Sequence, residues 1–284
     1  MERYDIIDTQ IHLFATMNIA EGLAAIDSLG IQGAIIDEFW GNDEATGLPL
    51  PFVGLSDGVW RPIAPGGQMA SMRHPDRFRY LLRVNHHDPE LNAVVRIAGQ
   101  DPGCVGLRIE ARAPIVAADF SAGRHESVFA AAIEAKLPVF VLAPGNAAAI
   151  GRYAASLNGN IVVDHIGLCD QPGMFEQVLE LAKWSNVYLK WSHPHRSFDS
   201  EYPFRPAIDG LHTAIAAFGA DRIMWGSDFT AVRTGNRWSD MLFYIRDSNS
   251  LSDDTKKWIL GLSARKLLNW SPPANLSAPI SIKH

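Results

Sequence analysis

Short runs of aliphatic and β-branched residues alternate along the chain with longer stretches in which apolar residues recur every three or four positions. The short runs are typical of buried strands, and the longer stretches are typical of helices packed on a sheet. Eight short runs occur, at residues 5–12, 34–40, 78–85, 105–111, 138–143, 160–167, 187–192 and 222–228. The helical stretches include residues 21–29, 126–135, 147–157, 174–184, 208–218 and 254–268.

Strands that alternate with helices build a parallel sheet, which must be covered on both faces. Because closing such a sheet removes its edges, eight regular units predict a single-domain α/β fold, the (β/α)8 TIM barrel, over residues 1–270. An open doubly wound sheet is the alternative. It is disfavoured because no glycine-rich phosphate-binding sequence follows the first strand.

Two segments depart from the regular alternation. Residues 41–77 are too long for an ordinary connection between a strand and a helix, so we expect a long loop over the barrel mouth, either a lid or an ornamental loop. Residues 271–284 are rich in Pro and Ser and lack periodicity, which predicts a flexible C-terminal tail.

Composition and charge narrow the class of protein. The 284 residues include 25 Lys+Arg and 31 Asp+Glu, a net charge of −6, which excludes a nucleic-acid binder built on a basic face. No apolar run approaches the roughly 18 residues of a membrane span, and no signal-peptide layout opens the chain, so we expect a cytoplasmic protein. Only Cys104 and Cys169 occur, too few for a disulfide framework or a cysteine zinc site.

Polar residues stand at the carboxyl ends of most predicted strands, where TIM barrels carry their active sites. Burying so many ionisable groups apart from one another would cost several kcal/mol each, so we expect them to share one polar cavity. They are, in strand order, Asp8, Gln10 and His12; Glu38 and Trp40; Asn85, His86 and His87; Arg108, Glu110 and Arg112; Asp164 and His165; Lys190 and Ser192; and Asp228.

Four of these strand ends resemble the amidohydrolase superfamily. They read DTQIH at residues 8–12, VDHIG at 163–167, NVYLK at 186–190 and WGSD at 225–228. More narrowly, they are similar to its branch of sugar lactonases and 2-pyrone-4,6-dicarboxylate lactonases, and the resemblance extends from residue 8 to about residue 270. It implies a TIM barrel that hydrolyses a cyclic ester.

The resemblance also raises the question of a metal. Metal-binding amidohydrolases usually present two histidines after the first strand, a histidine or modified lysine from the fourth and fifth, a histidine from the sixth and an aspartate from the eighth. Here Gln10 replaces the first histidine, the fifth strand is apolar, and Arg108 and Arg112 would repel a divalent cation. We therefore expect no cofactor, as in some members of that branch; a zinc ion, if bound, would be held by His12, His165 and Asp228.

The resemblance implies that Asp228 is the general base that activates water, while His12 and His165 polarise the carbonyl or carry a proton. The Arg and Lys residues at the strand ends predict that the substrate is an anionic small molecule. We expect Arg108 to bind its carboxylate through a bidentate pair of hydrogen bonds. The alternative for Arg108 and Arg112 is a ladder of ion pairs. The full set expected to bind substrate is Gln10, Arg108, Arg112, Lys190, Arg61, Trp40 and His193.

Three functions stay open from the sequence. The first is a metal-independent lactonase, or a lactone isomerase that uses a substrate hydroxyl in place of water. The second is a zinc-dependent hydrolase or decarboxylase of the same superfamily. The third is a barrel that has lost catalysis and only binds a ligand. A homo-oligomer is compatible with each of them.

Overall fold

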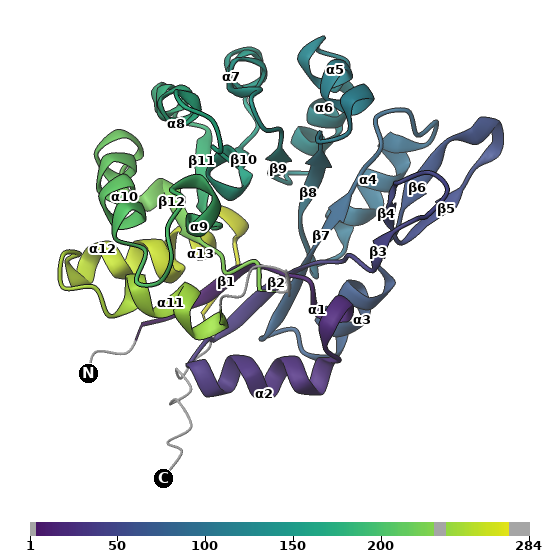
Figure 1. Cartoon of the computed structure of the whole chain (residues 1–284). Helices are drawn as coiled ribbons and strands as arrows, with labels where there is room; N and C mark the ends of the chain where they lie inside the picture. Colours follow the sequence, from purple (N-terminus) through teal and green to yellow (C-terminus); the bar gives the residue numbers. More distant parts are fainter. Residues whose placement is uncertain (1–3, 230–236, 273–284) are drawn as a thin grey trace.

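Eight parallel strands surround the centre of the molecule in the computed structural model, which describes residues 4–229 and 237–272 (Figure 1). Their order is β1-β2-β7-β8-β9-β10-β11-β12. They are β1 (Ile7–Ile11), β2 (Gly33–Asp37), β7 (Phe78–Arg83), β8 (Cys104–Glu110), β9 (Val139–Leu142), β10 (Ile161–Val163), β11 (Val187–Trp191) and β12 (Ile223–Trp225).

The chain closes the barrel just beyond β12. Ile11 forms a parallel bridge with Phe229, and the Asp228 amide donates to the Gln10 carbonyl at 3.0 Å. Each of the eight strands predicted from the sequence is present. The predicted single-domain (β/α)8 TIM barrel is therefore confirmed.

Helices cover the outer face of the barrel (Figure 1). The longer ones are α2 (Ile19–Leu29), α3 (Pro65–Arg73), α4 (Leu91–Gln100), α5 (Pro114–Ser121), α6 (Glu126–Glu134), α7 (Ala147–Ser156), α8 (Met174–Leu179), α10 (Arg205–Phe218) and α11 (Trp238–Arg246). Two short helices, α1 (Leu13–Thr16) and α9 (Pro194–Ser197), follow strand ends. Near the C-terminus, α12 (Asp253–Lys257) passes through a π-helical turn at Trp258–Leu262 into α13 (Ser263–Leu268). No helix in the described ranges has the length and apolar character needed to cross a membrane.

The segment 41–77 is only partly the long loop that its sequence predicts. Its last part forms α3, which takes the regular place of the helix between β2 and β7. The sequence does not predict this helix, because Gly66 and Gly67 weaken the helical pattern of apolar residues. They are needed for close packing, since a Cβ at Gly67 would lie 2.9 Å from the Cβ of Tyr80.

The first part of the segment forms two antiparallel ribbons, β3 (Gly41–Asn42) with β4 (Pro49–Leu50) and β5 (Phe52–Gly54) with β6 (Trp60–Pro62). Arg61 forms an ion pair with Asp88 at 2.6 Å, and Asn85 donates to the Trp60 carbonyl at 2.8 Å. Both partners belong to the loop that follows β7. These contacts hold the second ribbon at the rim of the barrel mouth, the end where the strands have their carboxyl termini.

The interior of the barrel has an apolar floor with polar residues above it. Each strand contributes one floor residue, and these are Ile7, Ile35, Leu81, Val105, Phe140, Val162, Tyr188 and Met224. Trp270 packs in the same cluster and closes the amino end of the barrel, while residues 273–284 of the predicted tail lie outside the described residues. Because side chains alternate along a strand, the next inward positions are two residues later, at Asp37, Arg83, Asp164 and Lys190.

Candidate active site

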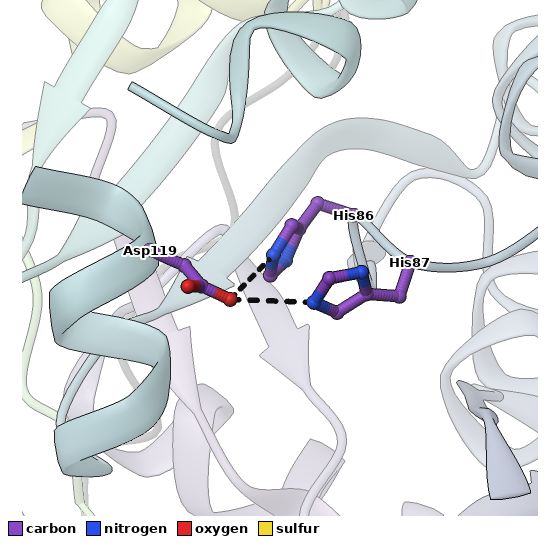
Figure 2. A group of neighbouring side chains, drawn as sticks. All are labelled: His86, His87 and Asp119. Carbon is purple, nitrogen blue, oxygen red and sulfur yellow. Dashed lines mark hydrogen bonds and ion pairs between the residues drawn. The ribbon is translucent and has the colours of Figure 1, made fainter. Parts of the chain in front are cut away.

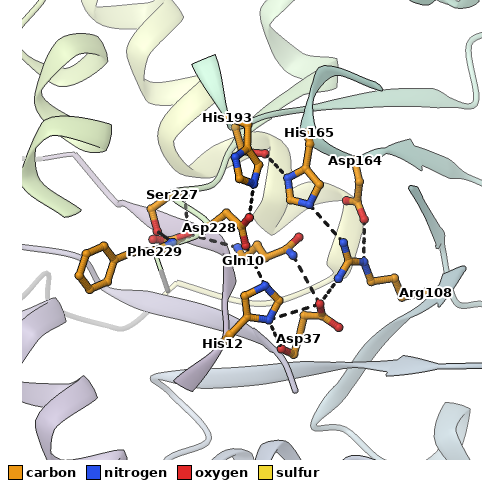
Figure 3. A network of polar contacts seen from close by, with 12 residues as sticks. Gln10, His12, Asp37, Arg108, Asp164, His165, His193, Ser227, Asp228 and Phe229 are labelled. Atoms are coloured by element: carbon orange, nitrogen blue, oxygen red, sulfur yellow. Dashed lines mark hydrogen bonds and ion pairs between the residues drawn. The ribbon is translucent and has the colours of Figure 1, made fainter. Parts of the chain in front are cut away.

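Polar side chains from many of the strands meet at the barrel mouth (Figure 3). Gln10 and His12 come from the end of β1, Asp37 from β2 and Arg108 from β8. The chain just after β10, β11 and β12 adds the remaining ones, and the whole set is largely buried. These additional residues are Asp164, His165, His193 and Asp228. The structure thus brings most of the sequence-derived candidates into one network.

The Asp228 carboxylate lies between two histidines of this network. Its Oδ1 lies 2.9 Å from His12 Nε2, and its Oδ2 contacts His193 Nε2. Burial by itself would raise the pKa of Asp228, but the nearby His193, His165 and His12 together hold this pKa well below its ordinary value. Asp228 is therefore an ionised carboxylate near neutral pH, and it is only 7% exposed.

Three of the site residues have a left-handed backbone. The φ angles are 50° at Asp228, 54° at His165 and 56° at His193. A non-glycine residue in this region costs about 1–2 kcal/mol, and such strain persists mainly where a functional site requires it. The turn directs each of these side chains into the mouth just where its strand ends.

The hydrogen bonds of His12 and His165 define which ring nitrogen carries the proton. His12 Nδ1 lies 2.6 Å from the Asp37 carbonyl oxygen, so Nδ1–H donates there and Nε2 faces Asp228. Arg108 Nη2 donates to His165 Nε2 at 3.2 Å, which leaves Nδ1–H to donate to Ser192 Oγ at 2.8 Å. Burial lowers the pKa of both histidines, while the nearby Asp228 carboxylate raises it.

The cations below the histidines are engaged by carboxylates of the chain itself. Arg108 bonds Asp164 at 2.9 Å and also contacts Asp37, and Lys190 Nζ bonds Asp164 at 2.7 Å. Arg83 joins the same network through Asp37 at 2.7 Å. Arg108 and Lys190 are 2% and 0% exposed. They form a buried ion-pair network, the alternative to the substrate grip expected from the sequence, because a guanidinium in a low-dielectric interior needs fixed partners.

The remaining candidates lie at the rim. Arg112 is half exposed and pairs with Glu110, Nε to Oε1, at 2.8 Å. Arg61 is committed to the loop after β7, as described above. Trp40 is half exposed, and its indole donates at 2.8 Å to Glu38, whose carboxylate also accepts the Gly67 amide at 2.8 Å. Glu38 thus faces α3 and not the barrel interior.

Sequence reasoning missed several members of the network. Asp37 and Arg83 follow the inward residues Ile35 and Leu81 by two positions, so strict alternation would have found them in place of Glu38. Another partner carries no local signal. Trp238 donates its indole N–H to Asp8 at 2.7 Å across 230 positions of sequence, and only the fold brings them together.

The donor groups at the mouth fit a divalent transition metal. His165, His193 and Asp228 each offer one ligand atom, and these atoms lie within 4.8 Å of one another. All three side chains are buried, and imidazole and carboxylate are ligands that zinc prefers. The sequence predicts His12, His165 and Asp228 as the metal ligands, whereas this cluster contains His193 in place of His12. One contact argues against a metal ion at this position, because His165 Nε2 already accepts a hydrogen bond from Arg108.

Comparisons with known proteins agree with this fold. The family model described as amidohydrolase matches residues 68–270. A probable 2-pyrone-4,6-dicarboxylic acid hydrolase from Acinetobacter baumannii, solved with citric acid bound, is 15% identical, with a TM-score of 0.68 over 93% of this chain and 99% of that one. A zinc-bound amidohydrolase from Burkholderia multivorans is 16% identical, with a TM-score of 0.71 over 93% and 99%.

A third similar structure carries a different activity. It is the manganese-bound 5-carboxyvanillate decarboxylase of Novosphingobium aromaticivorans, 16% identical, with a TM-score of 0.61 over 91% of this chain and 83% of that one. No curated protein sequence matches this chain significantly. At these identities the structural likeness establishes the fold and leaves the reaction open.

Proposed function

Because this chain belongs to the amidohydrolase family, we propose that it is an enzyme that hydrolyses a small anionic lactone, with Asp228 activating the attacking water. The observation that carries the proposal is an ionised carboxylate held at the barrel mouth between two imidazoles, those of His12 and His193. TIM barrels carry their reactive groups at this end. A lactone needs little further activation because its carbonyl is more electrophilic than that of an amide.

The proposed reaction begins with a water molecule hydrogen-bonded to Asp228. Its oxygen attacks the lactone carbonyl carbon while one proton moves to the carboxylate. A carboxylate with so low a pKa is a weak base, so the proton passes on to His12 Nε2, 2.9 Å away. The ring C–O bond then breaks, the alkoxide oxygen takes that proton, and a hydroxy acid leaves.

We propose that a carboxylate of the substrate is met by Arg112, the half-exposed cation at the end of β8. Arg108 and Lys190 act indirectly, because their ion pairs with Asp164 and the hydrogen bond from Lys190 to Gln10 fix these two residues under the histidines. A planar guanidinium suits a carboxylate through two parallel hydrogen bonds. The dicarboxylic acid substrate named for the Acinetobacter baumannii hydrolase is consistent with this class.

We further propose that the hydrolysis needs no metal. Gln10 Oε1 accepts from Lys190 at 2.7 Å, so this replacement for the first family histidine is already engaged. His165 Nε2 receives the Arg108 N–H, and β9 supplies only aliphatic and aromatic side chains. If a zinc ion does bind, His165, His193 and Asp228 would hold it, and it would polarise the carbonyl or lower the pKa of a water.

A metal-dependent decarboxylase is the second candidate. The cluster of His165, His193 and Asp228 favours it, together with the likeness to a manganese-bound decarboxylase. Under this alternative the same mouth would bind an aromatic carboxylic acid, and CO2 would leave instead of a hydroxy acid.

The two candidates differ in metal content and product. We would purify the protein without chelator, measure bound metal, and assay sugar lactones, dicarboxylate lactones and aromatic carboxylic acids. Asp228→Asn should lower kcat for the lactone about 10²–10⁴-fold. Asp247→Asn, a matched change at a half-exposed residue paired with Arg246, should leave kcat unchanged. Arg112→Gln should raise KM for carboxylated lactones only.

Each part of the proposal has its own contrary result. Full lactone turnover by Asp228→Asn would remove the proposed base. One equivalent of metal with turnover abolished by chelation would refute metal independence. Release of CO2 without any lactone hydrolysis would establish the second candidate instead.

A further inference from the structure

Two adjacent histidines and an aspartate form a second cluster at the rim of the barrel (Figure 2). His86 and His87 lie in the loop that follows β7, and Asp119 lies on α5, which follows β8. His86 Nε2 is 3.0 Å and His87 Nε2 is 3.3 Å from the same oxygen, Asp119 Oδ2. The two imidazoles therefore converge on one carboxylate oxygen from a neighbouring segment.

The surroundings hold two of the three side chains in place. Arg124 Nε donates to Asp119 Oδ1 at 2.7 Å, which leaves Oδ2 for the histidines. The ring of His125 packs against that of His86, tilted by 33° with centroids 3.9 Å apart, and His125 itself is buried. Such outer contacts are what orient the ligands of a metal site. The His87 side chain, in contrast, is 60% exposed and leaves one side of the cluster open to solvent.

The two histidine–aspartate separations are compatible with tetrahedral coordination. Metal–ligand bonds of about 2.0–2.1 Å at tetrahedral angles place neighbouring ligand atoms roughly 3.3–3.4 Å apart. The two histidine–aspartate separations, 3.0 and 3.3 Å, are close to this value, and all three donor atoms lie within 4.8 Å of one another. Two imidazole nitrogens and a carboxylate oxygen form a donor set that suits zinc.

We propose that His86, His87 and Asp119 bind a divalent transition-metal ion, with zinc the best match, in a site separate from the barrel mouth. A water molecule reaching the cluster beside His87 completes the coordination. The ion joins the loop after β7 to α5 more firmly than the hydrogen bonds between them. Its role is to brace the rim, and it does not depend on the function proposed for Asp228.

Zinc titration calorimetry can separate this site from the mouth. In the Asp228→Asn background, which weakens the mouth cluster, we expect one equivalent of Zn²⁺ to bind. Adding His87→Ala should remove that equivalent or weaken it at least about 100-fold, and Arg124→Gln should weaken it about 10–100-fold. His212→Ala, a change at an exposed histidine of α10, is the matched control and should alter nothing.

Co²⁺ in place of Zn²⁺ supplies a second readout, because tetrahedral Co²⁺ absorbs strongly in the visible range. We expect this absorption in the Asp228→Asn protein and its loss on adding His87→Ala. His87 is largely exposed, so that variant should keep the fold, which thermal unfolding without metal would verify. Equal Zn²⁺ affinity with and without His87, or no Zn²⁺ binding by the Asp228→Asn protein, would overturn the proposal.

Discussion

Asp164 links the two buried cations beneath the mouth, so replacing it with Asn tests how the polar interior is held together. Its Oδ1 lies 2.7 Å from Lys190 Nζ, and its Oδ2 lies 2.9 Å from Arg108 Nε. Asp164→Asn keeps the shape and removes the charge, which leaves an ammonium without its carboxylate in a site with no exposure. Breaking a buried pair in this way costs about 3–5 kcal/mol.

That cost is large compared with the roughly 5–15 kcal/mol that stabilises a typical domain. For a chain of this size it corresponds to a fall in Tm of roughly 6–10 °C, at about 2 °C per kcal/mol. Burial alone would raise the pKa of Asp164, but Lys190 and Arg108 together hold it below its ordinary value of 3.8. The stabilisation is therefore complete above about pH 4, and it is lost as the pH falls below that.

Urea unfolding at pH 7.5, followed by tryptophan fluorescence and far-UV circular dichroism, measures the effect. Asp221→Asn is the matched control, because Asp221 pairs with Lys266 at 3.4 Å on the surface and should change stability by less than about 1 kcal/mol. Lys190→Met in the Asp164→Asn background should recover part of the loss by removing the unpaired ammonium. An Asp164→Asn protein within about 1 kcal/mol of wild type, with an unchanged m-value, would refute this account of the network.

Three further predictions concern local features. Gly226→Ala should destabilise the fold by about 1–3 kcal/mol in urea unfolding, because a Cβ there would lie 2.8 Å from Thr9 Oγ1; an unchanged midpoint would contradict this. Burial raises the pKa of both Cys104 and Cys169 to about 12, so native protein should not react with a thiol reagent at pH 8, whereas unfolded protein should expose two thiols. Asn18→Ala should lower the free energy of unfolding by about 1 kcal/mol, because it removes the N-terminal cap of α2. Hydrogen exchange in the first turn of α2 should become faster, and unchanged exchange there would contradict this.

Most of the barrel could be predicted from local pattern. Strands such as residues 138–143 read as continuous apolar runs, and helices such as residues 147–157 show a clear amphipathic period, because they pack in the interior. Helix α3 could not be found in this way. Its paired glycines serve the close approach to Tyr80, a tertiary contact that lowers the local helical signal.

Candidate residues at the strand ends were predicted more reliably than their partners. The sequence motifs around His12, His165 and Asp228 indicated residues that do meet at the mouth. The same reasoning assigned Arg108 to the substrate, and the structure instead pairs it with Asp37 and Asp164. The sequence does not show which carboxylate pairs with a given arginine, because the partner comes from another strand.

The sequence by itself determined the eight strands, most of the helices between them and the polar residues that end the strands, since these depend on local periodicity. Tertiary structure alone decided which of those polar residues are free to act. Closure of the barrel brings residues far apart in the chain, such as Asp8 and Trp238, within 2.7 Å. In that buried interior each charge needs a fixed partner, so the ion pairs that form on folding, and not residue type, separate the structural cations from the groups around Asp228.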